Sequence, residues 1–592
     1  MNTNETTRGG STGARLVGGA GTGKTTELLN IMEKIIDRGF VPQQIGFVSY
    51  TRAARSEAAE RAAKKFTGVS AAELSGEFWF RTIHSLCFKQ LDSPKGFLLN
   101  TRKEDAAFIA AAIGAKDEGV AGISAKSAPS LKDTNEMTVL NLWAWCRSRL
   151  VSLAEGHQWA TDAGMEPPPI RTCIEKVTSY ERAKYIDNRL DPEDLLARFA
   201  GIDFDAERGP LVSDFGGEGD VPEVPVWFFD EQQDASPLLD KVAKRLVSGP
   251  ACRWYYLTGD PFQSIYSFSG ADSRCFMAWD VKERIMPQSY RCPKPIHELG
   301  ERVLKGCTDY FDRGIRPAEH EGRIEEMNSI SRVADRVRAD ESWLLIARSN
   351  WHANRMGKFL TARGIPWFPT SGVGGWGSPV RNAAVLALRK VSREAEISPG
   401  EFRALTKEIP SKVDGVEMFK RGTKKRFNQE PEKWRAGTKA KGAEQVDSEE
   451  VFDLFFDPQP TSAANAVESM QIQYDELETA GATPELIQYI KGGKALLSIP
   501  KGKEINRAYD QHGEEVLAKS DIQVGTIHSV KGSEADNVAF LTTISKIVQR
   551  GMQTKDGEDE EKRIQYVAIT RARKNLFIIN ESDANYRYNL GR

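Results

Sequence analysis

The sequence predicts an α/β protein built on parallel β-sheets with helices on both faces. Short apolar runs rich in strand-forming residues alternate with helical stretches along most of the chain, and such alternation is typical of parallel sheets. A glycine-rich loop separates the first apolar run from a helical pattern. Residues 95–195 and 383–521 break the alternation and are mostly helical in pattern. We therefore expect two helical insertions in an α/β framework.

The predicted strands are short and apolar. They cover residues 14–17, 44–50, 224–230, 254–258, 343–347, 538–543 and 576–580. Two segments have a different composition: residues 201–220 are polar and glycine-rich, and residues 551–561 end in an acidic cluster. Because such compositions are typical of loops, we expect both segments to be exposed loops.

Length and composition exclude several classes of protein. The 592 residues are too many for one hydrophobic core. No apolar run reaches the length of a membrane span, and the polar first ten residues contain no signal-peptide core. Seven cysteines and seven histidines are scattered without metal-ligand spacing, which disfavours a disulfide framework, a zinc ribbon or an iron–sulfur cluster. We expect a soluble, cytoplasmic, multidomain protein without a membrane partner.

The glycine-rich loop beginning at Gly18 fits the pattern G-x-x-x-x-G-K-[ST]. An apolar run precedes it, and Leu28 and Met32 follow at helical spacing, so the loop leads into a helix N-terminus. Backbone N–H groups converge in this arrangement and bind polyphosphate. Lys24 is placed to reach the β- and γ-phosphates, and the Thr25 hydroxyl to ligate Mg²⁺. The candidate ATP-binding residues are Gly18, Gly19, Ala20, Gly21, Thr22, Gly23, Lys24, Thr25 and Thr26.

A pair of carboxylates follows the apolar run at residues 226–229. Hydrolysis of ATP requires a carboxylate for Mg²⁺ and a group that activates water. Asp230 is the candidate metal ligand, and the adjacent Glu231 is the candidate base. An acidic pair after a core strand is also common on protein surfaces, but its combination with the phosphate loop favours the catalytic interpretation.

The overall charge does not indicate a nucleic-acid binder, because the net charge is −2. Such binding would therefore depend on local patches. One basic stretch runs from Lys420 to Lys441 and includes Phe427 and Trp434. Taken alone, it is compatible with a solvated surface as well as with a nucleic-acid contact.

Eight short segments resemble, in order, the motifs of superfamily 1 helicases of the UvrD/Rep/PcrA type. Residues 230–234 (D-E-Q-Q-D) resemble the box D-E-x-Q-D, and residues 259–271 resemble G-D-x-x-Q-S-I-Y-x-[WF]-x-G-A. The other segments are residues 49–54 (S-Y-T-R-A-A), 82–85 (T-I-H-S), 289–291 (S-Y-R), 346–350 (I-A-R-S-N), 526–534 (T-I-H-S-V-K-G-S-E) and 566–572 (Y-V-A-I-T-R-A). Eight segments in fixed order are far more specific than any one of them.

The resemblance implies an α/β fold of two RecA-like, parallel-sheet P-loop domains, each with a mainly helical insertion, and ATP in the cleft between them. The first domain (1A) would comprise residues 1–94 and 205–282, with insertion 1B at residues 95–204. The second domain (2A) would comprise residues 283–382 and 522–592, with insertion 2B at residues 383–521.

The resemblance also implies roles at the ATP site. Gln263 would sense the γ-phosphate, and Arg291 and Arg571 would act as arginine fingers from the second domain. Tyr290 would stack on the adenine, and Glu534 would hold the nucleotide from the second side. The implied catalytic set is Lys24, Asp230, Glu231, Gln263, Arg291 and Arg571.

By the same resemblance, the chain would be an ATP-dependent helicase that moves 3′→5′ on single-stranded DNA and acts at junctions of single strand and duplex. Stacking tolerates any base, so aromatic side chains suit such a strand site. The implied DNA-binding residues are Tyr50, Thr51, His84, Tyr266, Phe268 and Arg348. The second insertion, with its basic stretch, would face duplex DNA or protein partners.

Several departures from the family pattern leave alternatives open. Residues 1–13 contain no glutamine, whereas the family carries an adenine-reading L-N-x-x-Q segment before the phosphate loop. Phe268 and Ser269 stand where Trp and Arg are common, and the second insertion is compact. An ATP-gated DNA-binding or recruitment module with little unwinding is therefore one alternative, and an RNA helicase is another.

Overall fold

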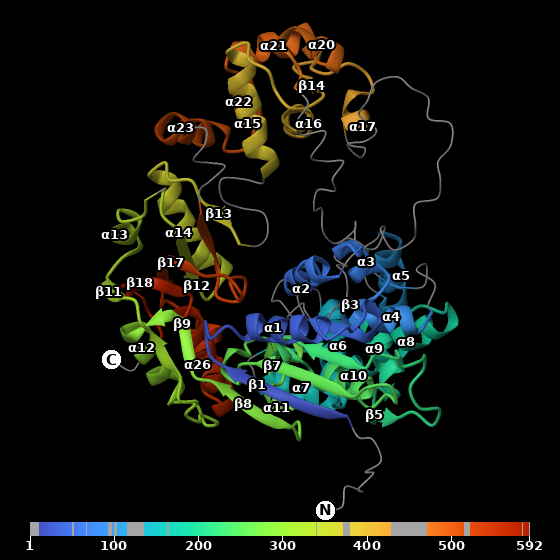
Figure 1. Ribbon diagram of the computed structural model, residues 1–592. Helices are drawn as coiled ribbons and strands as arrows, with labels where there is room; N and C mark the ends of the chain where they lie inside the picture. Colours follow the sequence, from blue (N-terminus) through green and yellow to red (C-terminus); the bar gives the residue numbers. More distant parts are fainter. Residues whose placement is uncertain are drawn as a thin grey trace, which may run out of the picture. The chain divides into compact units, whose positions relative to one another are not determined.

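The computed structural model describes most of the chain. The described residues are 11–49, 52–66, 68–92, 98–99, 103–114, 135–162, 165–338, 340–370, 379–427, 471–513, 521–582 and 584–590. The chain forms two compact units (Figure 1), and each is described by itself. Unit 1 comprises Met1–Gly322, Ser545–Arg571 and Asn589–Arg592, and unit 2 comprises Arg323–Ile544 and Ala572–Tyr588.

A six-stranded sheet forms the centre of unit 1, in the order β3-β2-β6-β7-β1-β8, and its pairings are parallel. Its strands are β1 (Thr12–Gly18), β2 (Ile45–Ser49), β3 (Trp79–Thr82), β6 (Val226–Phe229), β7 (Trp254–Gly259) and β8 (Lys282–Met286). The parallel sheet expected from the apolar runs is confirmed. The edge strand β8 crosses the expected domain limit at residue 282, so the first sheet extends to Met286.

A hydrophobic core covers each face of this sheet. Successive side chains of a strand point to opposite faces, so one strand contributes to both cores. On β6, Val226 and Phe228 belong to one core, and Trp227 and Phe229 belong to another. The first core includes residues of α1 (Lys24–Ile36), α2 (Arg52–Lys65) and α3 (Ala71–Gly76). The second includes residues of α4 (Ile83–Gln90), α9 (Pro192–Ala200), α10 (Pro237–Val247) and α11 (Ser273–Met277).

The chain between α4 and β6 is mainly helical. Besides α9, its helices are α5 (Lys103–Ile113), α6 (Asn135–Arg149), α7 (Leu153–Asp162) and α8 (Ile170–Ile186). Arg147 and Lys184 are buried and pair with Asp191 at 2.6 and 2.9 Å. The neighbouring carboxylates of Glu181 and Asp194 contact the same two cations, so the carboxylates of this cluster are ion-paired within the insertion.

Two predicted loops are partly wrong. Within residues 201–220, β4 (Ile202–Asp205) and β5 (Gly209–Val212) form an antiparallel hairpin, which lacks the apolar run of a buried strand because it is largely exposed. Within residues 551–561, α26 (Lys555–Ile569) begins. Its first turn carries Asp556 and Glu558, and acidic residues stabilise a helix N-terminus. The acidic cluster therefore belongs to a helix start rather than to a loop.

Several further elements complete unit 1. They are β9 (Gln288–Pro293), which pairs in parallel with β10 (Arg316–Ala318), and the helices α12 (Lys294–Leu304) and α25 (Lys546–Gly551). Helix α12 packs against α26. Residues 283–322 and 545–571, which the resemblance assigned to the second domain, thus form part of the compact unit that contains the phosphate loop.

Unit 2 contains the second six-stranded sheet, in the order β11-β18-β17-β12-β16-β13, with parallel pairings. Its strands are β11 (Arg323–Met327), β12 (Trp343–Ala347), β13 (Phe368–Pro369), β16 (Ile522–Thr526), β17 (Ala535–Leu541) and β18 (Ala572–Ile579). Two helices, α13 (Ile330–Ala334) and α14 (Asn350–Ala362), pack beside it. Two parallel sheets in one α/β chain confirm the predicted fold class.

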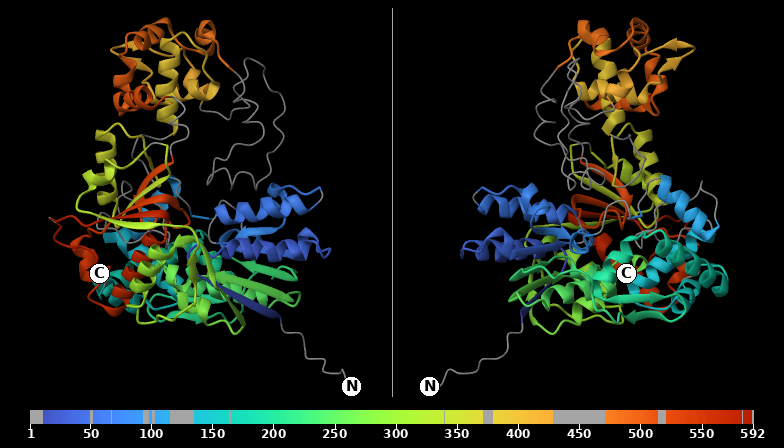
Figure 2. Two further views of the ribbon diagram at one scale, coloured as in Figure 1. Left: turned by 60° about the vertical axis from the view of Figure 1, so that its left-hand side comes forward. Right: turned by 90° about the vertical axis from the view of Figure 1, so that its right-hand side faces the viewer.

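The second insertion belongs to unit 2 (Figure 2). It consists of α15 (Pro379–Ser392), α16 (Pro399–Glu408), β14 (Lys412–Val413), β15 (Val416–Glu417), α17 (Thr423–Phe427), α20 (Leu477–Ala480), α21 (Pro484–Lys491), α22 (Ala495–Ser498) and α23 (Gly502–His512). One hydrophobic core joins its Phe402 and Ile505 to Leu345 of β12. The insertion is thus packed continuously onto its sheet.

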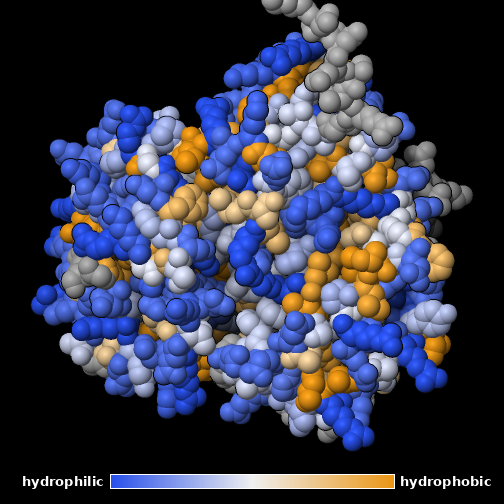
Figure 3. All heavy atoms as spheres, turned by 90° about the horizontal axis from the view of Figure 1, so that it is seen from below, coloured by the Kyte–Doolittle hydropathy of each residue, from blue (hydrophilic) through white to orange (hydrophobic). Residues whose placement is uncertain are grey.

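In the described part of the chain, no helix combines the length and the apolar character that a membrane crossing requires. Hydrophilic side chains dominate the face shown in Figure 3, and apolar ones form small separate groups. All seven cysteines carry free thiols, and all but Cys275 are buried.

Candidate functional site

The phosphate loop joins the buried strand β1 to helix α1. Gly21 and Gly23 have φ angles of 67° and 76°, in the left-handed region that glycine adopts at least cost. Gly23 is the residue directly before α1. Because the first N–H groups of a helix have no partner within it, this end of α1 can bind an anion.

Lys24 and Thr25 lie at the start of α1 as predicted. Lys24 is buried, and its Nζ donates a hydrogen bond to the Gly19 carbonyl at 3.1 Å. The Thr25 hydroxyl donates to Asp230 Oδ2 at 2.9 Å. The two groups predicted to ligate Mg²⁺ are therefore adjacent, and both offer oxygen, the ligand atom that Mg²⁺ prefers. Thr26 lies on the same turn and is exposed.

The acidic pair follows β6. Asp230 is fully buried, and burial together with the neighbouring Glu231 carboxylate raises its pKa well above the usual range. A nearby cation or metal favours the charged carboxylate, so the site is suited to a positive partner. Glu231 has a φ angle of 53°, an uncommon conformation for a residue other than glycine. Gln233 Nε2 donates to Glu231 Oε2 at 2.5 Å and thereby orients this carboxylate.

Gln263 is held at both ends of its side-chain amide. Its Nε2 donates to Asp260 Oδ2 at 2.8 Å, and its Oε1 accepts from Arg571 Nη2 at 3.5 Å. The backbone N–H of Asp260 donates to Gln233 Oε1 at 3.1 Å. Hydrogen bonds therefore connect Glu231 to Arg571 through Gln233, Asp260 and Gln263.

Arg291 lies against the phosphate loop. A Cβ added to Gly21 would be 2.2 Å from Arg291 Cβ, so only glycine permits this close approach. The preceding Tyr290 donates its backbone N–H to the Gly21 carbonyl at 2.8 Å, while its side chain is 73% exposed. An exposed ring beside the phosphate loop is compatible with the predicted stacking on a base.

Arg571 is buried two residues after the end of α26, and its Nε donates to the Val567 carbonyl at 3.0 Å. Burial and the neighbouring Arg291 lower the pKa of Arg571 to about 10. The guanidinium therefore remains charged at neutral pH. Because two neighbouring cations repel each other, a phosphate anion beside them would be favourable.

The sequence interpretation did not identify Arg313, although it is 2% exposed and central to the site. Its Nη1 contacts Asp260 Oδ1 at 2.7 Å, and its Nη2 contacts Glu301 Oε1 at 2.5 Å. Tyr566 lies beside it, with the guanidinium carbon 5.4 Å from the ring centroid. The Tyr566 hydroxyl accepts a hydrogen bond from the Ala20 N–H of the phosphate loop at 3.2 Å. Tyr566 and Asp260 stand in recognisable motifs, but no local pattern marks Arg313.

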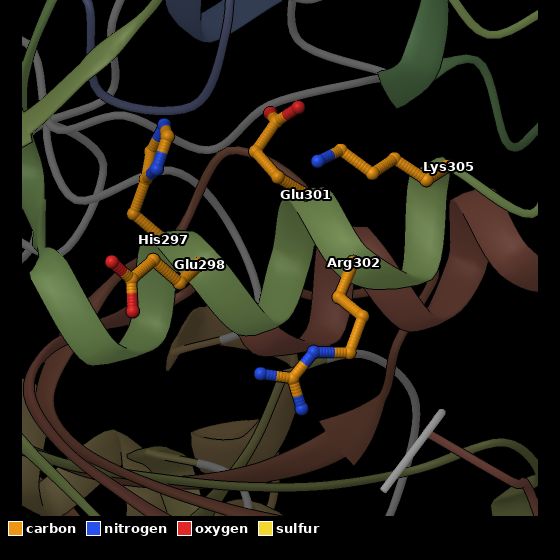
Figure 4. Close-up of a pocket in the computed structure, with 5 residues that line it drawn as sticks. All are labelled: His297, Glu298, Glu301, Arg302 and Lys305. Carbon is orange, nitrogen blue, oxygen red and sulfur yellow. The ribbon is translucent and has the colours of Figure 1, made fainter.

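A pocket of about 380 Å³ lies along α12 (Figure 4) and is lined by His297, Glu298, Glu301, Arg302 and Lys305. His297, Glu301 and Lys305 extend to one side of the helix, and Glu298 and Arg302 to the other. Glu301 is already paired with Arg313, and burial lowers the pKa of His297. None of the predicted site residues lines this pocket.

The predicted strand-binding residues of unit 1 are partly exposed. Tyr266 directly precedes the turn Ser267–Ser269 and Phe268 lies within it, and their ring centroids are 6.0 Å apart in an edge-on arrangement. His84 lies in the first turn of α4 and is half-buried. Tyr50 and Thr51 lie outside the described residues.

Two predicted site residues belong to unit 2. Arg348 follows β12 and is half-buried. Glu534 directly precedes β17, and its Oε1 lies 3.3 Å from Arg573 Nη1. The structure therefore groups these two residues with the second sheet, while the other described candidates belong to unit 1.

Three cations in the described part of the basic stretch make contacts within the insertion. The side chains of Lys420, Lys424 and Arg426 donate to the carbonyl oxygens of Glu478, Ile409 and Ala480 within the insertion. Burial also lowers the pKa of Lys424. Residues 428–441 of the stretch lie outside the described residues. These three cations thus contribute to the packing of the insertion.

Comparison with known proteins identifies the family of the chain. A model of the UvrD/REP helicase N-terminal domain matches residues 3–282, and a model of the UvrD-like helicase C-terminal domain matches residues 475–583. The chain is 23% identical to the ATP-dependent DNA helicase UvrD2 of Mycobacterium tuberculosis, over 95% of this chain and 75% of the relative. It is 21% identical to the ATP-dependent DNA helicase PcrA of Staphylococcus aureus, over 95% of this chain and 80% of the relative. The chain therefore belongs to the UvrD/Rep/PcrA type of superfamily 1 helicases, and it is an ATP-dependent DNA helicase with ATPase activity.

Proposed function

We propose that this helicase moves 3′→5′ on single-stranded DNA and couples ATP hydrolysis to duplex unwinding or to the displacement of bound proteins. The observation that carries the proposal is the convergence, within one compact unit, of the phosphate loop, the acidic pair, Gln263 and two arginines. A role in DNA repair or replication would suit such an enzyme.

In the proposed mechanism, Lys24 contacts the β- and γ-phosphates, and Thr25 and Asp230 hold Mg²⁺. When bound, the metal would neutralise phosphate charge. The Thr25–Asp230 distance of 2.9 Å supports this assignment, because both oxygens can face one ion. Glu231, oriented by Gln233, orients or deprotonates the attacking water.

Arg291 and Arg571 neutralise the charge that develops on the transferred phosphoryl group. Gln263 contacts Arg571 through its amide oxygen, so the two groups respond together to the γ-phosphate. Tyr290 stacks on the adenine, and Glu534 contributes to nucleotide binding from unit 2. Closure around ATP and opening after hydrolysis then supply the conformational cycle of the motor.

The strand is proposed to bind through stacking and backbone contacts. Tyr50, Tyr266 and Phe268 provide stacking surfaces, which tolerate any base. Thr51, His84 and Arg348 contact the phosphodiester backbone. The enzyme would act at junctions of single strand and duplex, with protein partners at the second insertion.

A second candidate function is an ATP-gated DNA-binding module with weak unwinding. One observation favours it. Within the insertion, carbonyl oxygens already accept hydrogen bonds from the side chains of Lys420, Lys424 and Arg426. Fewer cations would then be available to hold duplex phosphates. Preference for RNA over DNA is a third candidate, which ATPase stimulation by matched DNA and RNA oligonucleotides decides.

We expect the protein to unwind a duplex with a 3′ single-stranded tail in the presence of ATP and to leave the matched 5′-tailed duplex largely intact. The reason is that a motor bound to the single strand reaches the duplex only by moving toward the 5′ end. A strand-displacement assay on both substrates, with and without ATP, measures this. Equal unwinding of both substrates, or unwinding of the 5′-tailed one alone, would refute the polarity, and ATP hydrolysis without unwinding would support the binding module.

A further inference from the structure

One turn of unit 1 is held from two sides. It is the turn Ser267–Ser269, which directly follows Tyr266 and contains Phe268, the two proposed stacking residues. On one side, Trp145 Nε1 donates to the Ser267 carbonyl at 2.9 Å. Arg149, one helical turn further along α6, donates from Nη1 to the Ala271 carbonyl at 3.1 Å. Two side chains of helix α6, in the first insertion, thus form hydrogen bonds with the backbone at this turn and just after it.

On the other side, the turn is bonded to α26. The Ser267 hydroxyl donates to the Glu560 carboxylate. Helix α26 also carries Tyr566, whose hydroxyl contacts the phosphate loop, and Arg571 lies two residues after the end of this helix. One residue, Ser267, therefore connects the first insertion to the helix that positions the nucleotide-site arginine, through its carbonyl on one side and its hydroxyl on the other.

The indole of Trp145 is rigidly placed. Its side chain is 5% exposed, and it stacks on Trp159 with ring centroids 4.0 Å apart and an interplanar angle of 15°. The Arg149 guanidinium carbon lies 5.8 Å from the Trp145 ring centroid. Because a buried N–H without a partner is costly, movement of the turn away from Trp145 is disfavoured unless another acceptor replaces the Ser267 carbonyl.

We propose that Trp145 and Glu560 are positioning residues that couple the strand-binding turn to the ATP site. DNA that stacks on Tyr266 and Phe268 would fix the position of Ser267. The Ser267–Glu560 bond would then set the position of α26, and hence that of Arg571, for hydrolysis. The inference rests on the proposed strand site, but it assigns the coupling to residues outside the helicase motifs on which the chain was identified.

The test is DNA-stimulated ATP hydrolysis by Trp145→Phe. This substitution keeps an aromatic ring beside Trp159 and removes the indole N–H together with part of the bicyclic ring; the control below removes the same atoms. We expect the DNA-stimulated kcat to fall about 2- to 10-fold, the effect of one lost hydrogen bond. The kcat without DNA and the KM for ATP stay unchanged. Ser267→Ala should give a similar loss, and the double variant should lose less than the two single effects combined, because both act through one connection.

Trp143→Phe is the matched control. Trp143 lies on the same helix, and its Nε1 donates to Glu181 at 2.7 Å, toward the buried ion pairs and not toward the turn. Its loss should leave DNA stimulation intact. An equal loss in Trp143→Phe would show that packing of the insertion, and not the turn, controls stimulation, which would overturn the inference. Wild-type stimulation in Trp145→Phe would also overturn it, whereas an unstimulated wild-type protein would overturn the proposed function as well.

Discussion

We expect Lys24→Ala to abolish ATP hydrolysis while leaving the binding of single-stranded DNA largely intact. Lys24 is a buried amine whose Nζ lies 3.1 Å from the Gly19 carbonyl of the phosphate loop. Its loss removes the charge that contacts the phosphates as they become more negative. The loss of one such group typically costs about 10²-fold or more in kcat. Phosphate release in the presence of single-stranded DNA measures the first effect, and fluorescence anisotropy with a labelled oligonucleotide measures the second.

Lys34→Ala provides the control, because Lys34 is an exposed lysine in the last turn of the same helix. It should hydrolyse ATP at the wild-type rate. If Lys24→Ala also retained full activity, the phosphate loop would not be the site of hydrolysis. If both variants lost activity, the effect would come from helix α1 as a whole.

Arg571→Ala should lower kcat by about 10³-fold or more, in the range known for arginine fingers. Arg571 is buried beside Arg291 and within hydrogen-bond reach of Gln263, so it can respond to charge on the γ-phosphate. ATP binding should be reduced much less than hydrolysis, because the finger acts mainly on the transition state. Single-turnover hydrolysis together with a nucleotide-binding titration separates the two quantities.

Lys574→Ala is the matched control for this variant. Lys574 lies three residues further along, is exposed and is paired with Asp536. We expect it to keep its hydrolysis rate within about 3-fold of wild type, as is usual for an exposed ion pair. A comparable loss in both variants would argue against a specific role for Arg571.

The sequence predicted the parts of the site that depend on local chain geometry. A strand, a glycine loop and a helix start specify the phosphate loop within some twenty residues, so Gly21, Gly23 and Lys24 could be identified directly. The acidic pair could be identified because a fully buried strand precedes it. The two sheets followed from apolar runs such as Trp343–Ala347, which is buried at every position.

The remaining features depend on contacts between distant segments. Arg313 is separated from Asp260 by 53 residues, and its surrounding loop has no pattern that indicates a buried ion pair. The grouping of residues 283–322 and 545–571 with the phosphate loop is likewise a result of tertiary packing. The basic residues of the second insertion illustrate the same point, because a charge run does not reveal that Lys424 contacts the Ile409 carbonyl.

The central expectation is that DNA stimulates hydrolysis at the site formed by Lys24, Asp230, Glu231 and the two arginines. The most direct measurement is ATP hydrolysis as a function of single-stranded DNA concentration, for the wild-type protein and Glu231→Gln side by side. We expect saturable stimulation in the wild type and no measurable hydrolysis in the variant, which keeps the size of the side chain but loses the base. Equal rates in the two proteins, or a wild-type rate that DNA does not change, would contradict the claim.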